Sequence, residues 1–67
     1  MTYEDGEVGN RIYHHYWGHA TILAKRITLK YKFKVFDVRL EGDGIRKAPR
    51  GERLATEPQY WKKGLAP

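Results

Sequence analysis

Three histidines stand close together in GNRIYHHYWGHATI, which covers residues 9–22. Imidazoles can bind metal ions or exchange protons near neutral pH. Because His14 and His15 are consecutive, on a β-strand they would point to opposite faces and could not bind one ion together. The chain has no cysteine, and no carboxylate lies near His19 in the sequence to complete a tetrahedral set. We therefore expect no metal site and no cofactor.

A catalytic nucleophile is equally hard to find. The chain contains neither cysteine nor serine, and its threonines have no evident base partner with an orienting acid. Glu41 and Asp43 belong to EGDG, which is typical of a tight turn. No glycine-rich phosphate loop leads from a strand into a helix. We expect a binding protein, not an enzyme, with no small-molecule substrate.

The charge pattern favours polyanionic partners. Thirteen Lys and Arg residues face eight Asp and Glu residues, which gives a net charge of +5. In ITLKYKFKV, Lys30, Lys32 and Lys34 alternate with apolar residues, so on a strand they would share one face at intervals of about 6–7 Å. That interval is near the spacing of phosphates along a nucleic-acid strand. The same alternation is also typical of the solvated face of any antiparallel strand, so it has a purely structural explanation as well.

A nucleic-acid surface built on this row would include the basic residues before and after it. These candidates are Lys25, Arg26, Lys30, Lys32, Lys34, Arg39, Arg46 and Lys47. Rings from the opening segment would supply stacking faces or a partner surface, as in single-strand binders; they are Tyr13, His15 and Tyr16. Tyr13, Tyr16 and Trp17 could instead form a cage for a methylated cation, although a basic chain is a poor host for a basic peptide.

The sequence predicts that the elements that position these residues are strands. Residues 10–16 and 19–29 are rich in aromatic and β-branched residues, and strict alternation over 27–35 predicts a third strand segment with one buried face. At Val35–Phe36 the alternation changes phase to Phe36, Val38 and Leu40, which predicts a β-bulge or sharp bend. Tyr31 and Phe33, like Trp17, are expected in the core.

Turn signals divide the rest of the chain. EGDG predicts a reversal at 41–44, followed by a short returning strand that Pro49 stops. RGERL predicts another turn and a last short strand, and Pro58 can open a single helical turn. The result is an all-β fold of four to five short antiparallel strands with almost no helix. A chain this small solves its edge problem by curling into a barrel.

The chain is expected to hold one domain. We predict a polar lead-in at 1–8, a barrel at 9–55, and an irregular tail at 56–67 that packs on the barrel through Tyr60, Trp61 and Leu65. No run of about 20 apolar residues could span a membrane, and the acidic start does not resemble a signal peptide. These features and the lack of cysteine favour a cytoplasmic protein without membrane partners.

The order of glycine, strand and turn residues resembles small SH3-like barrels of the Tudor and KOW kind. Similar modules are the C-terminal module of UvrD-type helicases and the RNA-polymerase-interacting domain of CarD-type factors. The resemblance covers about residues 8–55 and departs from the pattern at Ala20, where glycine is common, and in the long lysine-rich segment between the second and third strands. It is carried by Gly9, Ile12, His14, Trp17, Gly18, Ala20, Thr21, Ile22, Val38, Leu40, Gly44, Ile45, Arg46 and Leu54.

The resemblance implies a module that binds DNA, RNA, RNA polymerase or methylated peptides, since one fold serves several ligands. Two functions follow as expectations. The first is binding of DNA or RNA through phosphate contacts with little sequence specificity. The alternative is a protein-interaction module, an accessory or inhibitory factor, that docks on an acidic surface of the transcription or replication machinery.

Overall fold

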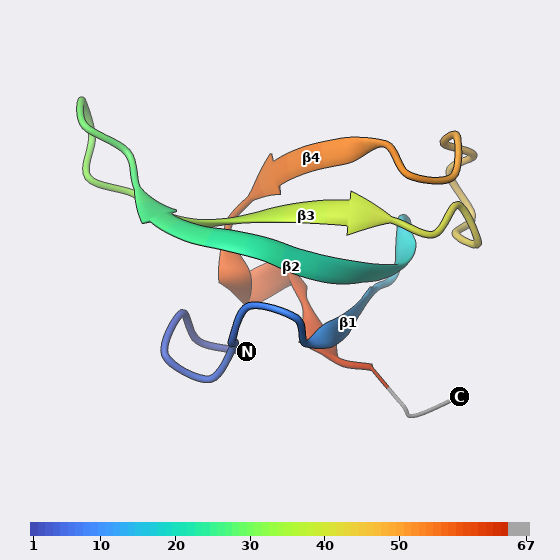
Figure 1. Cartoon of the computed structure of the whole chain (residues 1–67), viewed down its shortest axis with the longest axis horizontal. Coiled ribbons are helices and arrows are strands. Elements are labelled where there is room, and N and C mark those ends of the chain that lie inside the picture. The colour runs from blue at the N-terminus through green and yellow to red at the C-terminus, as the bar shows by residue number, and fades with distance from the viewer. Residues whose placement is uncertain (65–67) are drawn as a thin grey trace.

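A single five-stranded antiparallel sheet forms the molecule (Figure 1). The computed structural model describes residues 1–64, so the last three residues of the predicted tail, including Leu65, lie outside the described residues. The strands follow the order β4-β3-β2-β1-β5, and a short 3-10 turn, η1, precedes β5. Their bounds are β1 Arg11–His14, β2 Gly18–Ile27, β3 Lys34–Leu40, β4 Arg53–Thr56, η1 Pro58–Tyr60 and β5 Lys62–Lys63.

The all-β prediction with almost no helix is confirmed. Pro58 opens η1 at its first position, as the sequence predicts. β4 and β5 are the edges of the sheet and do not pair with each other among residues 1–64, so the sheet is open and resembles a barrel only loosely. No helix in this described part is long and apolar enough to cross a membrane.

One face of the three central strands carries the core. The alternation of Phe36, Val38 and Leu40 predicted for β3 is confirmed, because all three are buried. Ile12 and Ile22 are also fully buried, whereas Trp17, which was expected in the core, is only partly buried and packs against it. The full buried cluster is Ile12, Ala20, Ile22, Phe36, Val38, Leu40 and Trp61.

Both ends of the described chain close over this core. Trp61, just after η1, has no exposed surface and is among the largest buried side chains. Met1 and Tyr3 pack against the buried cluster, and the amino group of Met1 donates a hydrogen bond to the Trp61 carbonyl at 2.6 Å. The Tyr3 ring stacks on Phe36 with 5.9 Å between centroids. The polar lead-in and the tail therefore meet on the sheet.

Three predictions are wrong: an unbroken extended segment up to Leu40, a bulge at Val35–Phe36, and a strand after EGDG. The chain does not stay extended from 29 to 40: β2 ends at Ile27, and residues 28–33 form a hairpin loop before β3. The register shift that marks a bulge lies in β2, between Ile22 and Ala24, and not at Val35–Phe36. The expected strand after EGDG is absent, because the whole segment 41–52 is a loop between β3 and β4.

Glycines explain why this segment is a loop. The chain leaves β3 through Gly42, whose φ of 82° suits glycine. Gly44 then packs directly against the β1–β2 turn, where an added Cβ would lie 2.2 Å from the Trp17 carbonyl carbon. This close contact holds the 41–52 loop beside the β1–β2 turn and away from a strand position. The two segments form one end of the molecule, and the β2–β3 hairpin forms the other (Figure 1).

Candidate nucleic-acid interface

The β2–β3 hairpin projects beyond the rest of the sheet (Figure 1). Thr28 and Phe33 close it: the Thr28 N–H donates to the Phe33 carbonyl at 2.8 Å, and the Phe33 N–H donates to Thr28 Oγ1 at 2.9 Å and closes the loop from the other side. Residues 29–32 therefore form the tip. Lys32 has a φ of 54°, the only positive φ among the described non-glycine residues. Such a backbone costs an ordinary residue about 1–2 kcal/mol.

Apolar side chains at this hairpin lie in solvent and not in the core. Leu29 is 96% exposed and Tyr31 is 66% exposed, while Ile27 and Phe33 are each 52% exposed. The expectation that Tyr31 and Phe33 join the core is therefore wrong. Beyond Ile27 the hairpin extends past its neighbouring strands, so no second layer covers its apolar side chains. The rings of Tyr31 and Phe33 lie together, with centroids 5.8 Å apart and planes tilted by 30°.

Five cations and no acidic residue occupy positions 25–34. Two of them have acidic partners: Arg26 Nε donates to Asp37 Oδ2 at 2.8 Å, and Lys34 Nζ to Glu4 Oε1 at 2.9 Å. Lys25 Nζ lies 4.4 Å from the centroid of the Tyr3 ring.

Lys30 and Lys32 are the two cations of the tip, and they resemble Lys25 more than Arg26 and Lys34. Lys30 Nζ lies 5.4 Å from the centroid of the Tyr31 ring, and neither lysine forms an ion pair within residues 1–64. The hairpin tip thus carries positive charge that its own fold does not neutralise.

The other basic and aromatic candidates lie elsewhere. Arg46 and Lys47 are in the 41–52 loop, at the end opposite the hairpin, where the Arg46 guanidinium lies 4.8 Å from the centroid of the Tyr16 ring. His15 packs edge-on to the same Tyr16 ring at 4.9 Å. The remaining two, Tyr13 on β1 and Arg39 near the end of β3, are exposed but away from the hairpin tip. The candidate residues therefore form two groups and not one continuous row.

The histidines have separate roles. His14 Nδ1 accepts hydrogen bonds from the backbone N–H groups of Tyr16 at 3.0 Å and Trp17 at 3.3 Å, so it stabilises the β1–β2 turn. Burial lowers the pKa of His14, and the nearby positive charges of His15 and Arg46 lower this pKa further. A neutral His14 is the form that can accept these bonds.

The expectation that no carboxylate lies near the histidines is wrong in the folded chain. His19 Nδ1 and Asp43 Oδ2 are 2.7 Å apart, and one ligand atom from each of His19, Glu41 and Asp43 lies within 4.8 Å of the others. Each group already has a partner, because Glu41 receives two hydrogen bonds from Arg11. Hydrogen bonds from His19 and Arg11 lower the pKa values of Asp43 and Glu41, respectively. The cluster connects β2 to the 41–52 loop through hydrogen bonds between polar side chains.

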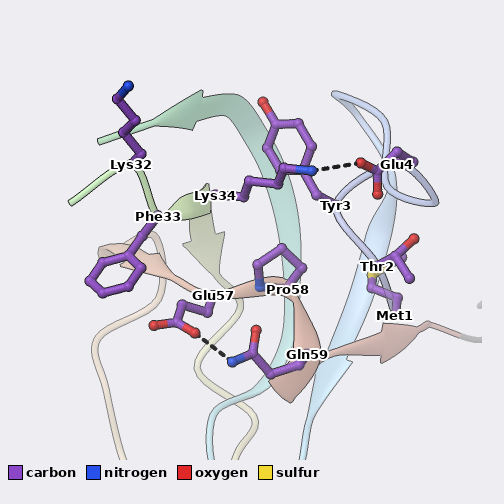
Figure 2. Close-up of a pocket in the computed structure, with 10 residues that line it drawn as sticks. All are labelled: Met1, Thr2, Tyr3, Glu4, Lys32, Phe33, Lys34, Glu57, Pro58 and Gln59. Atoms are coloured by element: carbon purple, nitrogen blue, oxygen red, sulfur yellow. Dashed lines mark hydrogen bonds and ion pairs between the residues drawn. The ribbon is translucent and has the colours of Figure 1, made fainter. Parts of the chain in front are cut away.

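A shallow groove of about 420 Å³ lies at the base of the hairpin (Figure 2). Phe33 lies on one side of it and Tyr3 on the other, with Pro58 between them. Sequence analysis missed Tyr3, which stands in the lead-in with no local signal, and placed Phe33 in the core. The residues that line the groove are Met1, Thr2, Tyr3, Glu4, Lys32, Phe33, Lys34, Glu57, Pro58 and Gln59.

Comparisons of the chain with protein-family models, with curated proteins and with solved structures find no significant match.

Proposed function

We propose that this chain is a non-enzymatic binding module that contacts DNA or RNA through the β2–β3 hairpin, with little sequence specificity. One observation carries the proposal: a projecting tip combines unpaired lysines with exposed aromatic rings. Lys30 and Lys32 would contact phosphates, and Lys25, Arg26 and Lys34 would extend the positive field toward the sheet. Tyr31 and Phe33 would provide stacking faces beside the phosphates. We place the module in the cytoplasm.

The backbone of the tip supports a binding role. Lys32 adopts a positive φ that glycine would adopt without strain. Strained positions of this kind cluster at functional sites, where another requirement sets the residue type. We expect Lys32→Gly to leave stability unchanged or to raise it by up to about 1 kcal/mol, because relief of strain exceeds the extra entropy of glycine. The same change should weaken nucleic-acid binding.

We keep the SH3-like assignment of the Tudor and KOW kind as part of the proposal. The strand order β4-β3-β2-β1-β5, in which β1 to β4 form consecutive antiparallel pairs, supports it. The resemblance in sequence covers the same strands. A module of this kind is expected to bind a partner and not to carry out chemistry.

Leu29 favours a second candidate function. This side chain is almost fully exposed at the tip, and a leucine gains little from a phosphate backbone. Exposed apolar residues on a projecting element are typical of protein-interaction sites. The alternative is therefore an accessory or inhibitory factor whose hairpin docks on an acidic protein surface of the transcription or replication machinery.

The test is a titration of fluorescent DNA and RNA oligonucleotides at several salt concentrations. The variant Lys30→Gln/Lys32→Gln removes two charges from the tip. The matched control, Lys47→Gln/Arg50→Gln, removes two exposed charges from the 41–52 loop. We expect the tip variant to lose affinity for every sequence and to flatten the plot of log affinity against log salt by about 1.4–1.8, at 0.7–0.9 for each lost contact. The control should change both quantities much less.

Other outcomes would redirect the proposal. Equal losses in both variants would show that binding follows net charge and has no site at the hairpin. No binding by the unmodified chain at low salt would refute the nucleic-acid function. Binding of an acidic protein that survives nuclease treatment and depends on Leu29 would then support the alternative.

A further inference from the structure

The groove beside the hairpin differs from the tip in charge. The charged groups that line the groove have both signs: Lys32, Lys34 and the Met1 amino group are positive, and Glu4 and Glu57 are negative. Glu4 is paired with Lys34, and Glu57 contacts the Gln59 amide, as Figure 2 shows. The two lysines without an ion pair among residues 1–64 are on the tip: Lys30 does not line the groove, and the Lys32 side chain at its edge points away from Pro58 in Figure 2. A polyanion would therefore place its phosphates on the tip and a neutral group in the groove.

The groove also has the shape and lining for a flat, neutral ring. Its volume of about 420 Å³ lies within the usual range for small-ligand sites, about 300–1,000 Å³. Phe33, which is about half exposed, forms one wall of the groove in Figure 2. The centroid of its ring lies 5.8 Å from that of Tyr31 at the tip. The neighbouring rings of Tyr31 and Phe33, of which Phe33 lines the groove, make a stacking path for one or two bases.

Only an unpaired base could use this path. In a duplex the bases are stacked on each other and expose only their edges, whereas a single strand can turn its bases out onto aromatic side chains. We propose that the hairpin and its groove select single-stranded over double-stranded nucleic acid by stacking unpaired bases on Tyr31 and Phe33. This inference rests on the proposed nucleic-acid function. Because every base has a π-face, the selection does not depend on sequence.

The experiment separates stacking from charge. The variant Tyr31→Leu/Phe33→Leu keeps apolar side chains and every charge but removes both rings. Its matched control is Tyr16→Leu, which removes an exposed ring at the opposite end of the molecule. Affinities for a 20-nucleotide single strand and for the duplex of the same sequence are measured at several salt concentrations and compared at each one. Circular dichroism checks that each variant folds. If Tyr31→Leu/Phe33→Leu does not fold, the single variant Tyr31→Leu, at the exposed tip, replaces it.

We expect the unmodified chain to prefer the single strand. The ring variant should lose about 5- to 150-fold in single-strand affinity for each stacked base, with less than a two-fold change for the duplex. Its salt dependence should stay unchanged, because no cation is removed, and Tyr16→Leu should change neither affinity. Equal affinity of the unmodified chain for both forms, or equal losses for both forms in the ring variant, would overturn the inference and leave the proposed function standing. No binding to either form would overturn both.

Discussion

Two neighbouring aromatic residues after β4 should differ sharply in their effect on stability. Trp61 is fully buried and Tyr60 is 61% exposed, although they are adjacent in the chain. Truncation of a buried tryptophan to alanine costs about 3–5 kcal/mol. A domain of 67 residues has a total stability of about 3–10 kcal/mol. Trp61→Ala should therefore lower the melting temperature by about 12–40 °C or leave the chain unfolded at room temperature.

Tyr60→Ala is the matched control, and it should change stability by less than about 0.5 kcal/mol. Trp61→Phe should cost less than half as much as Trp61→Ala. Phenylalanine keeps a large apolar ring, and it removes the buried Nε1–H, which has no acceptor among residues 1–64. Urea unfolding followed by circular dichroism measures all three variants. A loss below about 1 kcal/mol for Trp61→Ala, or equal losses for Trp61→Ala and Tyr60→Ala, would refute the placement of Trp61 in the core.

Three further predictions concern the end opposite the hairpin. Gly44→Ala should lower the free energy of unfolding by about 1–3 kcal/mol in urea titrations, because its Cβ would meet the Trp17 backbone. The free energy of unfolding should fall as the pH drops below 6.5, the ordinary pKa of histidine, because the unfolded chain then binds a proton that the folded chain does not. The fall should level off below the lowered pKa of His14 in the folded chain. His14→Gln should flatten this dependence in urea midpoints measured from pH 8 to 5. EDTA should leave the melting curve unchanged, because His19 and Asp43 already bind each other; a lower melting temperature would reveal a stabilising metal.

Local periodicity was enough to predict the core of the sheet. Phe36, Val38 and Leu40 alternate with Asp37 and Arg39 inside one strand, so these three core residues lie at the interval of two that a strand imposes. In β2, Ala20 and Ile22 are buried at the same interval of two. The burial of Trp61 depends on contacts with distant strands, so the sequence indicated only that an aromatic tail would pack somewhere on the domain.

The position of the hairpin could not be predicted from the same pattern. Alternation of polar with apolar residues continues without a break from 27 to 35, and the segment has no Gly, Pro, Asn or Asp to mark a turn. Lys32 takes the positive φ that such a residue would usually supply. Sequence therefore predicted the chemistry of the candidate site, cations beside aromatic rings, but placed those rings in the core.

Groups that meet through the fold left no sequence signal. His19 and Asp43 are 24 positions apart, and the 41–52 loop brings them together beside β2. Tyr3 reaches the hairpin base because the lead-in packs on the buried cluster and the Tyr3 ring stacks on Phe36. Both depend on long-range packing, which periodicity and turn residues do not encode.

The central claim, that the hairpin is the binding surface, is tested most directly by NMR. A ¹⁵N-labelled chain is titrated with a short single-stranded oligonucleotide at low salt, and the backbone amide shifts are followed. We expect the largest shifts at residues 25–34, with smaller ones at Tyr3 and Gln59 in the groove. Shifts concentrated at residues 15–16 and 45–50 would contradict this account and move the site to the opposite end of the molecule. No shifts at saturating oligonucleotide would contradict nucleic-acid binding itself.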